Sequence, residues 1–118
     1  MRYVILLVCL FSNHAFAQFE TGQRLVLGFE AAGRMTQTSF RPGDPGEAGI
    51  LIGYISGVAD SYMNTDWCPT TQITVDQLMR VVAKYLDNNP NKLGMSAAWI
   101  VYVALKESFP CAPRIQQK

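Results

Sequence analysis

The side chains that could carry out catalysis are few in this sequence of 118 residues. Its only histidine is His14, so no other histidine is present to activate Ser56 or Ser61 as a nucleophile. Asp60 and Asp66 could form a pair of carboxylates for acid–base chemistry, but each is equally suited to a hydrogen bond at a helix end or in a loop. We therefore predict a protein that binds a partner and has no enzymatic activity.

The first seventeen residues have the pattern of a secretory signal peptide. Arg2 supplies a positive charge, residues 3–11 are apolar, and Ala15-Phe16-Ala17 matches a signal-peptidase site. The apolar run is about nine residues long, whereas a membrane span needs about twenty, which favours cleavage over an uncleaved anchor. We predict a signal peptide at residues 1–17, cleavage before Gln18 and a periplasmic domain of residues 18–118 that is not membrane-bound.

Cleavage would change the chemistry of the chain. His14 is lost, and the loss of Arg2 leaves nine basic residues against nine acidic ones. A chain without net charge or a basic run lacks the electrostatic pattern of a nucleic-acid-binding protein. Without histidine, and without the acidic spacing of a calcium loop, no metal site or cofactor is predicted.

The cysteines then allow a single intramolecular pair. Cys9 belongs to the signal peptide, and Cys111 follows Cys68 by 43 residues. In an exported protein such a pair is typical of a disulfide, the alternative being two free thiols. We predict a Cys68–Cys111 bond.

Apolar periodicity predicts the elements that carry these residues. Helices are expected over residues 20–34, 47–63, 74–88 and 94–108. Thr74 and Gln77 have the spacing of a capping box at the start of the third helix. Residues 36–47, rich in glycine and proline, indicate a loop. The predicted fold is all-α: one small domain, a bundle of about four helices with one disulfide.

The second helix has glycines four residues apart, at Gly49, Gly53 and Gly57. This spacing places them on one helical face, where each costs about 1 kcal/mol relative to alanine. Close packing of another helix would explain them, either within the domain or across a dimer. A ligand or partner surface is the alternative.

A polar loop over residues 64–72 surrounds Cys68 and contains Trp67. Trp67 could anchor a protein interface or pack over the disulfide, and the sequence does not separate these roles. Tyr62 and Arg80 are further candidates for the centre of an interface. Trp99 lies on an apolar helical face and is expected in the core.

Several short motifs, in this order and spacing, resemble one protein family. They are Gly53-Tyr-Ile-Ser-Gly-Val-Ala-Asp60, Trp67-Cys-Pro69, Ile73-Thr74, Gln77-Leu78, Val81–Leu86 and Phe109-Pro-Cys111. The sequence over residues 49–111 resembles the Rap/Tai-type immunity proteins of type VI secretion systems. The resemblance implies a periplasmic helical protein, often a homodimer, that inhibits a peptidoglycan amidase toxin by blocking its active-site groove with a loop.

The resemblance also implies which residues contact the toxin. The partner-binding loop corresponds to residues 64–72, and the predicted contacts are Asn64, Asp66, Trp67, Thr70, Thr71 and Gln72. Many members have a second cysteine pair, which this chain lacks at the matching positions, Gly28 or Phe29 and Leu51. Two alternative functions stay open: a periplasmic acid-stress chaperone, and an orphan periplasmic binding domain with another partner.

Overall fold

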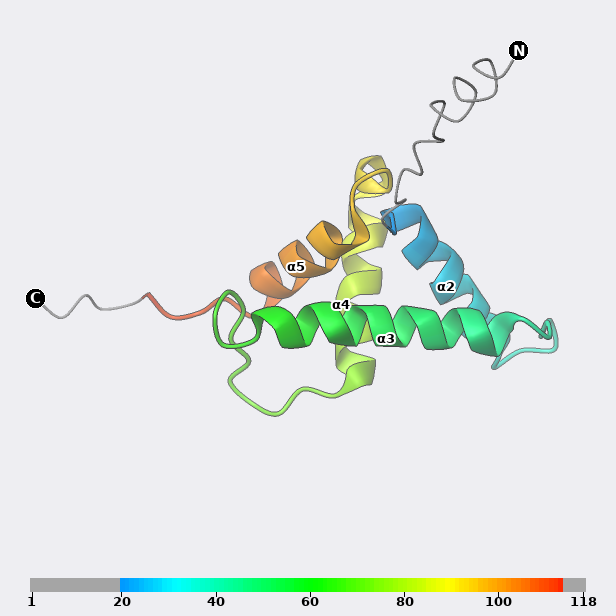
Figure 1. The fold of residues 1–118 in the computed structure, drawn as a ribbon, viewed down its shortest axis with the longest axis horizontal. Coiled ribbons are helices and arrows are strands. Elements are labelled where there is room, and N and C mark those ends of the chain that lie inside the picture. Colours follow the sequence, from blue (N-terminus) through cyan, green and yellow to red (C-terminus); the bar gives the residue numbers. More distant parts are fainter. Residues whose placement is uncertain (1–19, 114–118) are drawn as a thin grey trace, which may run out of the picture.

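The computed structural model describes residues 20–113, and this part of the chain folds into four α-helices without a strand. The elements are α2 (Gly22–Arg34), α3 (Asp44–Tyr62), α4 (Val75–Asn88), the 3-10 helix η1 (Pro90–Lys92) and α5 (Ala97–Ser108). In Figure 1, α3 lies across α4, with α2 and α5 on either side. The all-α prediction is confirmed, whereas the predicted signal peptide and its cleavage site before Gln18 lie outside the described residues.

A single core joins the helices. Its largest fully buried side chains are Ile55 on α3, Val82 on α4, and Ile100, Val101 and Leu105 on α5. The α5 residues recur at intervals of one, four and five, so they share one helical face. Ala97 and Ala104 are buried on the same face of α5.

The start of α4 has the predicted capping box. The Gln77 backbone N–H donates to Thr74 Oγ1 at 3.2 Å, and the Thr74 N–H donates to Gln77 Oε1 at 2.8 Å. Each bond satisfies a backbone donor that the first helical turn leaves unpaired. This cap fixes where the preceding loop ends.

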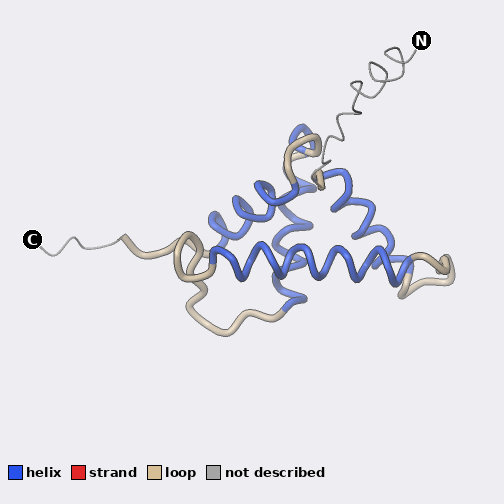
Figure 2. The backbone as a smooth tube through the Cα atoms, viewed as in Figure 1, coloured by secondary structure: helices blue, strands red, loops and turns tan. Residues whose placement is uncertain are grey.

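Helix α3 begins at Asp44, three residues earlier than the predicted start at Glu47. Pro45 is compatible with this position because the first helical turn needs no N–H from it. Asp44 is only 2% exposed and accepts hydrogen bonds from Arg34 Nη2 at 2.6 Å and from the Arg41 N–H at 2.8 Å. The buried carboxylate therefore joins the end of α2 to the start of α3 across the loop of residues 35–43, which Figure 2 shows at one end of α3.

Replacing Asp44 with asparagine should lower the midpoint of thermal unfolding at pH 7 by on the order of 10 °C, because Arg34 loses its carboxylate partner. The hydrogen bonds from Arg34 hold the pKa of the Asp44 carboxyl below its usual value. The stabilisation is therefore present above the unfolded-state pKa, near about 4, and is lost as the pH falls through the lower folded-state pKa.

Melting curves of both proteins from pH 7 to pH 3 test this. Their midpoints should converge as the pH falls. Asp76→Asn is the matched control, because Asp76 forms an exposed ion pair with Arg80 and its loss should shift the midpoint much less. A difference between wild type and Asp44→Asn that stays constant down to pH 3 would contradict the prediction.

Of the alternatives for the α3 glycines, packing against another helix of residues 20–113 is ruled out, and packing across a dimer or against a partner or ligand stays a prediction. A Cβ atom placed on Gly49, Gly53 or Gly57 would meet nothing within 4 Å among the described residues. The other face of α3, with Leu51 and Ile55, is the buried one. Both faces are apolar, so hydrophobicity alone could not identify the buried face.

No helix of residues 20–113 is long and apolar enough to cross a membrane, α3 included.

The close approach within the domain occurs instead between α2 and α3, at Gly28. A Cβ atom on Gly28 would lie 2.9 Å from the Leu51 Cβ, which is closer than real Cβ atoms approach. Glycine is therefore needed at this contact. Gly28 and Leu51 are among the positions at which the resemblance implies a second cysteine pair.

Trp99 is not in the core, contrary to the prediction. It is 36% exposed, and the ammonium nitrogen of Lys92 lies 5.5 Å from its ring centroid. Apolar side chains cover more of α5 than the face that packs against the core. Ala97, Ile100 and Val101 occupy that face, so Trp99 is left at its side.

Candidate protein-binding loop

The segment of residues 63–74 joins α3 to α4 and projects beyond the helices (Figure 1). It includes the predicted binding loop of residues 64–72. Thr70, Thr71 and Gln72 are exposed, and Thr74 closes the segment with the capping box of α4. The part that projects furthest is therefore polar and available for contact.

Trp67 holds the base of this loop inside the domain. Its side chain is 2% exposed, its Nε1–H donates to the Ala59 carbonyl at 2.9 Å, and its ring centroid lies 5.7 Å from that of Phe109. A buried indole needs such a hydrogen-bond partner. Of the two roles predicted for Trp67, the structure supports packing, and its contact with a partner stays a prediction.

A tight turn precedes Trp67. Asn64 has a φ of 63°, which asparagine adopts more readily than most residues. Its N–H donates to the Trp67 carbonyl at 2.8 Å, while the Tyr62 carbonyl accepts from the Thr65 hydroxyl at 2.8 Å and from the Asp66 N–H at 3.0 Å. These local bonds fix how the chain leaves α3.

The disulfide ties the far side of the same turn to the end of α5. Cys68 and Cys111 are bonded, with their Cα atoms 4.7 Å apart, which confirms the predicted pairing. Next to it, the Cys68 N–H donates to the Phe109 carbonyl at 2.8 Å. The base of the loop is therefore linked to α5 by a covalent bond and a backbone hydrogen bond.

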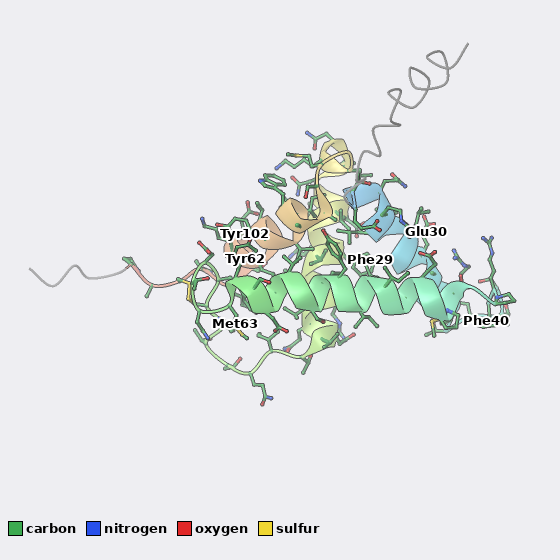
Figure 3. The ribbon with its side chains drawn as sticks, in the orientation of Figure 1. Phe29, Glu30, Phe40, Tyr62, Met63 and Tyr102 are labelled. Atoms are coloured by element: carbon green, nitrogen blue, oxygen red, sulfur yellow. A yellow bond between two sulfur atoms is a disulfide. The ribbon has the colours of Figure 1, made fainter. Side chains whose placement is uncertain are left out.

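An aromatic and charged cluster lies beside the turn. The rings of Tyr62 and Tyr102 meet edge to face, with centroids 5.1 Å apart. Figure 3 labels the two residues near each other. The Tyr102 hydroxyl donates to Asp66 Oδ1 at 3.4 Å and accepts from Lys106 Nζ at 3.2 Å. The hydrogen bond to Tyr102 raises the pKa of Lys106 above its usual value. The cluster connects α5 to the loop through side chains.

A shallow cleft of about 350 Å³ opens on the loop, between the end of α3 and the start of α4. Trp67 and Leu78 are among its apolar lining residues, and Asn64, Thr71 and Gln72 are among its polar ones. Four predicted contact residues, these three polar ones and Trp67, are thus brought together around a cleft that a partner side chain could enter.

The predicted contact residues therefore separate into groups. Asn64, Trp67, Thr71 and Gln72 line the cleft, Thr70 lies exposed beside them, and the Asp66 carboxylate accepts a hydrogen bond from Tyr102. The structure also shows three nearby residues that the sequence analysis did not select: Met63, which is 40% exposed, Tyr102 and Lys106. The last two are four residues apart on α5, a spacing that places them on one face.

Candidate catalytic groups are not assembled here. Asp60 lines the cleft, whereas the Asp66 carboxylate accepts hydrogen bonds from Thr65 and Tyr102. Within residues 20–113, no three histidine, cysteine or acidic side chains are grouped so as to hold a metal ion. The arrangement favours recognition of another molecule by shape and hydrogen bonding.

Comparison with known proteins adds one finding. A family model described as Rap1a immunity proteins matches residues 21–111, from the residue before α2 to the second cysteine of the disulfide. No curated protein matches the sequence. The matched range contains all four helices of the described part and the whole projecting loop.

Proposed function

Because the chain belongs to the Rap1a immunity protein family, which implies a protein effector as its partner, we propose that it inhibits a peptidoglycan amidase delivered by a type VI secretion system. We place this activity in the periplasm. Two features support that location: the signal-peptide pattern of residues 1–17, and a disulfide of the kind that persists in oxidising compartments.

The observation that carries the mechanism is a projecting loop with a rigid base. Trp67, the disulfide and the Asn64 turn hold the base, while Thr70, Thr71 and Gln72 remain exposed. A loop already ordered in its binding conformation loses less entropy when a partner binds. In the proposed mechanism the loop enters the active-site groove of the amidase and excludes its substrate, without any chemical step.

The homodimer that the resemblance implies is part of this proposal. The outer face of α3 is the surface we assign to it. Gly49, Gly53 and Gly57 leave the helix backbone open there, and the neighbouring Ile50 is 56% exposed. Residues 48–59 carry no charged side chain, so a second copy could approach without burying an unpaired charge.

Binding to amidases from type VI clusters tests the loop. The variant Thr70→Ala/Thr71→Ala/Gln72→Ala should bind at least about 30-fold more weakly than wild type if these residues include a hot spot. Its melting temperature should be unchanged, since all three side chains are exposed. Affinity is measured by calorimetry with mature residues 18–118, and inhibition by peptidoglycan hydrolysis.

Gln37→Ala/Ser39→Ala is the matched control, because it removes exposed polar side chains from the other long loop. It should retain full affinity. Equal affinity of the loop variant and wild type would remove the loop from the interface. Failure of wild type to bind or inhibit any amidase in a broad panel would overturn the amidase as the partner, although family membership would stand.

A further inference from the structure

Two adjoining hollows form a groove between α2 and α4, away from the loop cleft. The wider hollow has a volume of about 590 Å³, and Ile52 and Met79 are among its lining residues. The narrower one, of about 350 Å³, has Glu30 and Asp87 at its edge. Phe29 and Ala83 line both, so we treat them as one surface, the α2/α4 groove. Figure 3 labels Phe29 and Glu30, the adjacent α2 residues on this surface.

Small residues keep the groove open. A Cβ atom on Gly33 would meet nothing within 4 Å, and Ala83 presents a single methyl group where α2 and α4 face each other. The surface left in water is apolar: Ile52 is 41% exposed and Val75 is 46% exposed. Exposed apolar side chains gathered in a hollow are typical of a surface that another molecule covers.

The charges of the groove differ along its length. At the wider end, Asp76 is paired with Arg80. At the narrower end, Glu30 and Asp87 form no ion pair within the described part of the chain, and both line the same hollow. That end is therefore acidic above an apolar floor that includes Val26 and Leu86.

We propose that the α2/α4 groove binds an amphipathic helix of a second protein. This helix places an apolar side chain in the wider hollow and a lysine or arginine in the acidic one. The aliphatic stem of the cation would lie on Phe29 and Leu86, with its charged group near Glu30 and Asp87. Met79 and Asp87 are about 12 Å apart along α4, so the two side chains stand about two turns apart on the ligand helix. This surface goes beyond the proposed inhibition by the loop.

Designed peptides test the groove in the mature protein, residues 18–118. The first probe is a capped helical peptide with two leucines four residues apart and a lysine two turns to either side, so that either orientation offers a cation. Titration followed by NMR should give a dissociation constant below about 1 mM, with shifts confined to groove residues such as Met79 and Ala83. A second peptide, with glutamate in place of lysine, should bind at least about 10-fold more weakly.

Variants separate this surface from the loop. Ala83→Leu should abolish peptide binding by filling the hollow, and Glu30→Gln/Asp87→Asn should remove the preference for lysine without changing the fold. Leu27→Ser is the control, since Leu27 is an exposed apolar residue of α2 outside the groove. The Thr70, Thr71 and Gln72 variant should bind the peptide like wild type, whatever its effect on the amidase.

Any of three results with the peptides would overturn the proposal: no shifts at 1 mM of the lysine peptide, shifts centred outside the groove, or equal affinity for both peptides. A groove already covered by a second copy, seen as concentration-dependent shifts of the same residues without peptide, would equally overturn it.

Discussion

Replacing Trp67 with alanine is expected to lower the free energy of unfolding by about 4 kcal/mol, the usual cost of removing a large buried aromatic side chain. The ring is 2% exposed, and the variant also loses the hydrogen bond from Nε1 to the Ala59 carbonyl. Small domains are stabilised by only about 5–15 kcal/mol in total, so the variant should lose a quarter or more of the wild-type stability. Urea denaturation followed by circular dichroism measures the change.

The sequence provides a matched control in its other tryptophan. Trp99 is 36% exposed and its ring contacts the Lys92 ammonium group, so Trp99→Ala should cost only about 1 kcal/mol. Trp67→Phe should fall between the two, because it keeps an aromatic ring but loses the hydrogen bond. If Trp67→Ala were as stable as Trp99→Ala but failed to inhibit the amidase, Trp67 would be a contact residue after all.

Removing the disulfide with Cys68→Ser/Cys111→Ser is expected to cost a similar amount. The two cysteines are 43 residues apart, and closing a loop of that length in the unfolded chain corresponds to about 4 kcal/mol in the chain-entropy model. The base of the binding loop should also become more mobile, because the ties to α5 that remain are all non-covalent: the Cys68 N–H bond to the Phe109 carbonyl and the side-chain contacts of Tyr102. Amide hydrogen exchange at residues 62–68, together with urea denaturation, measures both effects.

Wild-type protein treated with a reductant controls for the change from cysteine sulfur to serine oxygen. It should unfold at the same urea concentration as the serine variant. The amides of α2 should keep their protection in the native state of both proteins, since no cysteine contacts that helix. An unchanged unfolding midpoint in the variant would mean that the disulfide contributes nothing to stability.

The sequence predicted the elements whose signals are local. The start of α4 follows from Thr74 and Gln77 alone, because a capping box is completed within one turn. The pairing of Cys68 with Cys111 follows from counting cysteines once the signal peptide is set aside. The start of α3 was misplaced because Asp44 and Pro45 suit both a turn and a first helical turn, and the buried bond to Arg34 decides between them.

The sequence left open which side of an element meets the core. Helix α3 is apolar around most of its circumference, so the spacing of Gly53 and Gly57 located a face without showing whether it was covered. Trp67 lies in an irregular loop with no periodicity to indicate its direction, and its acceptor at Ala59 is defined only by the tertiary fold. The α2/α4 groove is formed by helices that are far apart in the sequence, so no local pattern predicts it.

The contact between Gly28 and Leu51 holds α2 against α3 by shape alone, whereas the contact between the loop and the end of α5 includes a covalent bond. The close fit of Gly28 against Leu51 aligns the two helices without needing an oxidant, so α2 and α3 can pack together as soon as the chain is free to fold. The loop and the end of α5 gain their covalent tether only where thiols are oxidised. The α2–α3 contact therefore needs no particular redox environment, whereas the proposed inhibitory loop becomes fully rigid only in an oxidising one.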